Sequence, residues 1–99
     1  MGIDVGSSSV KVAILDSDTG EIIATAQHPD QEMPMKALHP GWAEQDPEMW
    51  YEATERCIEK IKKIASNDLK EVKAVGISYQ MHGLVCLDKN GRPVRDSII

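Results

Sequence analysis

The sequence predicts an α/β fold with a mixed sheet, in which an antiparallel three-strand meander is joined by one parallel strand and a packing helix. Three short apolar segments, residues 2–6, 10–15 and 21–26, are separated by polar turns, as in consecutive antiparallel strands. A helical pattern of apolar residues starts near residue 47, and another apolar strand is expected over residues 72–79. Because that strand is reached through a helix, we expect it parallel to the first strand and beside it.

Length and composition restrict the classes of protein. The 99 residues suit one small domain, and the net charge of −5 comes with no basic run that would bind a nucleic-acid backbone. No apolar run is long enough to span a bilayer, so no membrane partner is expected. The two cysteines show no metal-site spacing, and we expect reduced thiols in a cytoplasmic protein.

The helix has a clear start and an apolar stripe. Asp46 is placed as the N-cap and Pro47 at the first helical position. The residues expected to face the core are Trp50, Ala53, Cys57, Ile61 and Ile64, with the helix ending over residues 66–68. The proline-rich segment 27–46 before it is expected to be irregular, with Trp42 as an anchor into the core. Past residue 79 we expect a short strand over 84–87 and a hairpin-type turn over 88–91.

The first candidate site follows the first strand. Asp4 ends this strand, Gly6 permits positive φ or the close approach of a ligand, and serines occupy positions 7–9. Serine hydroxyls and backbone N–H groups can bind an anion, and Lys11 adds a positive charge for phosphate oxygens. A carboxylate near phosphate needs a cation between the two, and Mg²⁺ is the usual ion. The alternative is a plain β-hairpin with a polar turn.

The second candidate site, Gln80-Met81-His82-Gly83, follows the strand expected over 72–79. Ligands of open α/β sheets bind beyond the carboxyl ends of strands, and Asp4 also lies at such an end. If the two strands are parallel neighbours, both sites open at the same edge of the sheet. Gln80 and His82 can then hydrogen-bond hydroxyl groups, and Gly83 allows the chain to turn. The alternative is a polar turn with a surface histidine.

Three blocks of sequence, residues 4–11, 41–50 and 76–83, together resemble the amino-terminal domain of the FGGY carbohydrate kinases. Within that family the turn at residues 80–83 is most similar to that of the xylulokinases. The resemblance implies a ribonuclease-H-like (actin-like ATPase) domain that binds the sugar, truncated in this chain, and a carboxyl-terminal ATP domain outside residues 1–99. The last two residues, Ile98-Ile99, are read as the start of a further strand.

The resemblance also implies roles for individual residues. Asp4 would organise Mg²⁺ through water, and the ATP phosphates would approach Gly6, Ser7, Ser8 and Lys11. The sugar pocket would be lined by the second site, with the residues Gln80, Met81, His82 and Gly83. The general base of the family is an aspartate expected downstream of this chain, so His82 is assigned to substrate binding.

The reaction implied is transfer of the γ-phosphoryl group of ATP to a sugar hydroxyl, with D-xylulose as the expected acceptor and D-xylulose 5-phosphate as the product. Two alternatives stay open: a kinase for another polyol or sugar acid such as gluconate, and a non-catalytic actin-like ATP-binding module. Residues 1–99 alone are expected to be inactive. They are also expected to expose an apolar face, which could lead to self-association as a homodimer.

Overall fold

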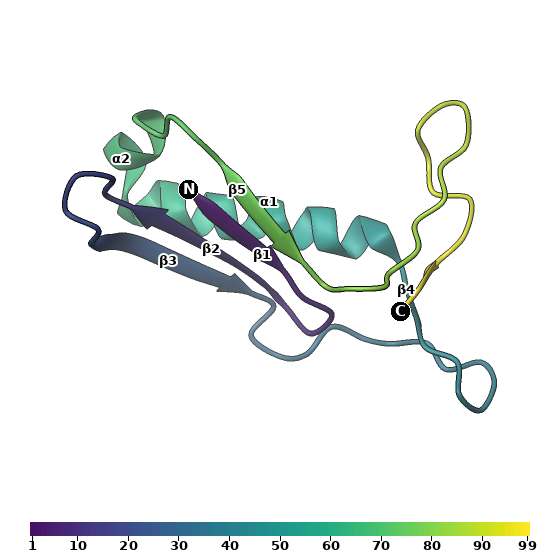
Figure 1. Ribbon diagram of the computed structural model, residues 1–99. Helices are drawn as coiled ribbons and strands as arrows, with labels where there is room; N and C mark the ends of the chain where they lie inside the picture. Colours follow the sequence, from purple (N-terminus) through teal and green to yellow (C-terminus); the bar gives the residue numbers. More distant parts are fainter.

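The computed structural model describes residues 1–99 and contains a four-stranded sheet in the order β3-β2-β1-β5 (Figure 1). Its strands are β1 (Gly2–Val5), β2 (Val10–Leu15), β3 (Ile22–His28) and β5 (Gly76–Tyr79). β1 pairs antiparallel with β2 and β2 with β3, whereas β5 pairs parallel with β1. The predicted meander and its parallel neighbour are therefore both confirmed.

Helix α1 (Pro47–Ile64) covers one face of this sheet (Figure 1). The Asp46 carboxylate caps it by accepting a 3.0 Å hydrogen bond from the backbone N–H of Glu48, as predicted. Ala53, Cys57 and Ile61 are buried, but the expectation for Ile64 is wrong, since it is 67% exposed. The buried positions advance in steps of four residues, so the next core residue is Ala65 at the end of the helix.

The core lies between α1 and the sheet. The inward residues of β2 alternate along the strand, and the buried apolar set is Ile3, Val10, Val12, Ile14, Ala24, Met33, Ala53, Cys57, Ile61 and Ala65. The Cys57 thiol donates a 3.3 Å hydrogen bond to the carbonyl oxygen of Val10. Burial raises the pKa of this thiol, so Cys57 is a protonated packing residue at neutral pH.

Two strand boundaries differ from the prediction. β5 begins at Gly76 and not at residue 72, because its first paired residue lies opposite Gly2, where β1 itself begins. A short helix, α2 (Ser66–Lys70), occupies the segment expected to end α1. Residues 84–87 form no strand, since only Leu84 and Leu87 make isolated bridges, to Ile98 and Pro93.

A second, two-stranded sheet was not predicted, although Ile98, expected near the start of a strand, does lie in one of its strands. β4 (Glu44–Gln45) lies inside the segment expected to be irregular and pairs antiparallel with β6 (Ser97–Ile98). The hairpin-type turn at residues 88–91 is confirmed, because the Asp88 carboxylate accepts hydrogen bonds from the backbone of Asn90 and Arg92. Trp42 is not a core anchor, since it is 50% exposed and packs edge to face on His39. Neither helix has the length and apolar character needed to cross a membrane.

Candidate functional site

Two turns lie at the same edge of the main sheet. The serine turn (residues 6–9) follows β1, and the 80–83 turn follows β5, which runs parallel to β1. The backbone N–H of Gln80 donates a 2.9 Å hydrogen bond to the carbonyl oxygen of Val5, so the two strands are joined up to the point where both turns begin. The predicted common edge is confirmed.

Asp4 lies on the face of the sheet that α1 leaves uncovered, because its neighbour Ile3 packs in the core. Across the sheet it is paired with Lys11 on one side and Ser78 on the other. The Ser78 hydroxyl donates a 2.7 Å hydrogen bond to Asp4 Oδ1. These residues line an open hollow of about 700 Å³, together with Thr25 and Gln27 of β3.

The serine turn is closed by a 3.1 Å hydrogen bond from the N–H of Gly6 to the carbonyl oxygen of Ser9. A Cβ atom on Gly6 would lie 3.0 Å from that oxygen, so glycine is needed for the tightness of the turn. The positive φ considered for Gly6 is not found. The backbone N–H groups of Ser7, Ser8 and Ser9 donate no hydrogen bond within the chain. Such free amides in one turn form a concavity suited to an anion.

The carbonyl groups of the same turn are occupied. Ser7 O accepts a 2.6 Å hydrogen bond from the Gln45 side chain, and Ser8 O accepts a 2.8 Å bond from the backbone N–H of Met33. Gln45 did not stand out in the sequence, because its partner is 38 residues away and no local pattern relates the two. Ser78 also was not assigned a role from the sequence.

The 80–83 turn contains an unusual backbone conformation at His82, whose φ is +66°. We expected Gly83 to provide the freedom to turn, but the left-handed position belongs to His82, and Gly83 has no positive φ. A non-glycine residue in this region is held there at a conformational cost, and such residues concentrate at functional sites. Met81 is 76% exposed, and His82 is exposed as well.

Two buried polar atoms lie close to Gly83 of this turn. Gln80 Nε2 and Ser97 Oγ are inaccessible and have no hydrogen-bond partner. Both lie close to Gly83, at 3.8 and 3.7 Å from the place a Cβ atom would take there. Ser97 belongs to β6, so no signal near residues 80–83 could have revealed it. The turn is thus supported from β6 and carries unused hydrogen-bonding capacity.

The Asp4 carboxylate is the one group of this site that we consider as a metal ligand. No group of three or more His, Cys, Asp and Glu side chains is arranged to hold an ion. The Ser78 hydroxyl is bonded to Asp4 Oδ1, and Oδ2 receives no hydrogen bond. One free carboxylate oxygen fits Mg²⁺, which binds one or two carboxylates and completes its octahedron with water and phosphate oxygens.

A family model for the FGGY family of carbohydrate kinases, N-terminal domain, matches residues 1–99. The chain belongs to this family. It is 39% identical to the xylulose kinase of Escherichia coli and 37% identical to a xylulose kinase of Staphylococcus epidermidis, each over 99 residues. The chain spans 19% of the length of each relative, and all of its own residues are aligned.

Solved structures agree with this assignment of the FGGY chain. A xyloylose kinase from Brucella ovis matches with a TM-score of 0.90 and 33% identity, over 99% of this chain and 20% of that one. A gluconate kinase from Lactobacillus acidophilus matches with a TM-score of 0.78 and 28% identity, over 98% of this chain and 18% of that one. The predicted actin-like, ribonuclease-H-like fold class is confirmed by these FGGY neighbours.

Proposed function

We propose that this chain is the amino-terminal, sugar-binding part of a kinase that transfers the γ-phosphoryl group of ATP to D-xylulose, giving D-xylulose 5-phosphate. The observation that carries the proposal is the common sheet edge, where a turn with three free amides lies beside the 80–83 turn. The similarity to xylulose kinases of Escherichia coli and Brucella ovis supports the sugar.

The serine turn is proposed as the phosphate side. The amides and hydroxyls of Ser7 and Ser8 would bind phosphoryl oxygens, and Gly6 keeps the turn narrow enough for these groups to converge. Lys11 lies opposite Asp4 on the uncovered face of the sheet, where its ammonium group would balance negative charge. Phosphoryl transfer spreads charge over the phosphoryl oxygens, so positioned donors and cations are the main catalytic requirement.

Asp4 is proposed to hold Mg²⁺ through water, with Ser78 fixing the orientation of the carboxylate. When bound, the ion would neutralise phosphate charge next to this acidic side chain. Outer hydrogen bonds of this kind orient metal ligands, which gives Ser78 a role in the same site.

The 80–83 turn is proposed as the sugar side. His82 offers hydrogen-bonding groups for sugar hydroxyls and Met81 offers an apolar surface. Gln80, whose Nε2 is buried close to Gly83, would support these residues from within the turn. The general base is not assigned within residues 1–99. His82 is proposed to bind and orient the acceptor. Correct orientation of two bound substrates supplies much of the rate of a transfer reaction.

A sugar acid is the second candidate acceptor. The specific observation in its favour is the similarity to the gluconate kinase of Lactobacillus acidophilus. The same serine turn would serve either acceptor, so the difference would depend on the 80–83 turn and on groups outside this chain.

A substrate panel on the full-length protein tests the proposal. D-xylulose, gluconate and glycerol are offered with ATP and Mg²⁺, and ADP release is followed with each. We expect D-xylulose to give the highest kcat/KM. A preference for gluconate would select the second candidate, and ADP release with none of the acceptors would contradict a sugar kinase.

A further inference from the structure

We propose that Gln45 is a positioning residue that sets the direction of the amides in the serine turn. This inference rests on the proposed function, because it assigns those amides to phosphate binding. Gln45 lies in β4 and is only 1% exposed. Its backbone pairs with Ser97 of β6, which is not among the residues proposed to touch substrate. Its effect would be exerted through the Ser7 carbonyl group.

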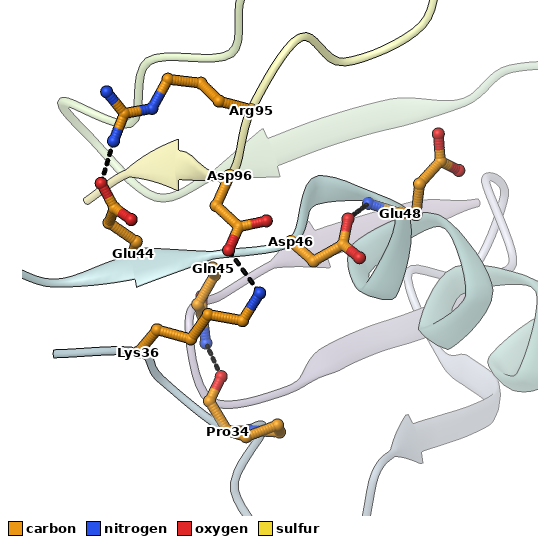
Figure 2. Close-up of polar contacts among 8 residues, drawn as sticks. All are labelled: Pro34, Lys36, Glu44, Gln45, Asp46, Glu48, Arg95 and Asp96. Carbon is orange, nitrogen blue, oxygen red and sulfur yellow. Dashed lines mark hydrogen bonds and ion pairs between the residues drawn. The ribbon is translucent and has the colours of Figure 1, made fainter. Parts of the chain in front are cut away.

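The Gln45 side chain uses every part of its amide group. Nε2 donates to the carbonyl oxygens of Ser7, at 2.6 Å, and Pro34, at 3.2 Å. Oε1 accepts a 3.2 Å hydrogen bond from the Trp50 indole N–H. Figure 2 shows the amide directed toward Pro34, with neighbouring ion pairs above it. A buried amide with both donors and its acceptor in use has one defined orientation.

The consequence for the turn follows from peptide geometry. In a planar trans peptide the C=O of one residue and the N–H of the next point in opposite directions. Holding Ser7 O with Gln45 therefore fixes the N–H of Ser8 on the opposite side. The Met33 N–H holds Ser8 O in the same way, which fixes the N–H of Ser9. The N–H groups of Ser8 and Ser9 therefore point away from the side chain and the backbone amide that hold the preceding carbonyl groups.

The strand that carries Gln45 also reaches the sugar side. β4 pairs with β6, and Ile98 of β6 accepts a 3.0 Å hydrogen bond from the N–H of Leu84, the residue directly after the 80–83 turn. Two ion pairs reinforce this connection, Glu44 with Arg95 and Lys36 with Asp96 (Figure 2). The β4–β6 sheet therefore links the two proposed halves of the site.

The test uses Gln45→Met in the full-length protein, which keeps the side-chain volume and removes both donors. Gln31→Met is the matched control, because Gln31 is an exposed residue with no hydrogen bond. We expect the KM for ATP to rise about tenfold in Gln45→Met, with the KM for the sugar unchanged. Should this variant not fold, Trp50→Phe removes only the bond to Oε1 and is expected to give the same selective rise at about twofold.

Amide hydrogen exchange supplies a readout that does not need kinase activity. The N–H of Gly6 donates to Ser9 O within the serine turn, and the N–H of Met33 donates to Ser8 O of the same turn. The exchange rates of these two amides therefore report the geometry of the turn. Both are expected to exchange about tenfold faster in Gln45→Met, while amides between β2 and β3 keep their rates. Unchanged exchange, or equal rises in KM for ATP and sugar, would overturn the inference. A wild-type protein that phosphorylates no sugar would instead contradict the proposed function, and hydrogen exchange would still decide the role of Gln45.

Discussion

Ser78 and Asp4 are 74 residues apart in sequence and share a 2.7 Å hydrogen bond across the pair of parallel strands β1 and β5. The bond joins the carboxylate that precedes the serine turn to the strand that leads into the 80–83 turn. It leaves Asp4 Oδ2 free on the uncovered face of the sheet. The two proposed halves of the site are therefore coupled at their base by one hydroxyl group.

Loss of this hydroxyl is expected to impair catalysis more than sugar binding. In Ser78→Ala the full-length protein should lose about tenfold in kcat, because the Asp4 carboxylate is no longer oriented. The KM for the sugar should stay near its wild-type value. Thr25→Ala is a matched control, since Thr25 lines the same hollow without a hydrogen bond to Asp4. A wild-type kcat in Ser78→Ala would show that the bond has no role in the reaction.

The left-handed backbone of His82 predicts an unusual order of stability among variants. Both His82→Gly and His82→Ala remove the imidazole, but only glycine adopts a φ of +66° without steric cost. We expect His82→Gly to be more stable than His82→Ala by about 1 kcal/mol in denaturant unfolding. At ordinary helical or strand positions glycine is the less stable of the two. Finding that usual order here would contradict the backbone conformation of the turn.

The two cysteines are expected to differ in reactivity. Cys86 is exposed, whereas Cys57 is buried and burial raises the pKa of its thiol. Since the thiolate is the reactive form, one thiol per chain should react quickly with a chromogenic disulfide reagent at neutral pH. The second should react only when the protein unfolds. Cys86→Ser should abolish the fast phase, and rapid reaction of both thiols would mean that Cys57 is not buried between α1 and the sheet.

Replacement of Ser97 by alanine is expected to stabilise the fold. Its hydroxyl is fully buried and has no hydrogen-bond partner, so it carries a desolvation cost without compensation. Ser97→Ala should raise the free energy of unfolding by about 1 kcal/mol. The exposed Ser17→Ala serves as the control, with a change within about 0.5 kcal/mol. Destabilisation by Ser97→Ala would reveal a partner for the hydroxyl, such as an ordered water.

Much of this architecture could be predicted because its signals are local. Alternating apolar residues marked the meander, and Asp46-Pro47 marked the start of α1. The parallel placement of β5 followed from a general rule on crossover connections, and it brought Asp4 and residues 80–83 to one edge. The strand predicted at residues 84–87 does not form, because an apolar run forms a strand only where a partner strand is available along its length. That condition depends on distant parts of the chain.

The parts that could not be predicted depend on distant contacts. Gln45 looks like any polar residue before a helix, and only the folded chain brings it to Ser7. Trp42 and Trp50 are equally apolar in sequence, but Trp50 contacts Gln45 while Trp42 packs on exposed His39. The strained position in the 80–83 turn was expected at its glycine, because conformational preference alone does not indicate which residue the surroundings hold in place.

The division of the site into a phosphate turn and a sugar turn is tested most directly by steady-state kinetics of His82→Ala in the full-length protein. The KM values for D-xylulose and for ATP are measured on the same preparation, beside Gln31→Met as a control. If His82 binds only the sugar, the KM for D-xylulose rises at least about tenfold while the KM for ATP stays within about twofold. Equal rises in both constants would contradict it.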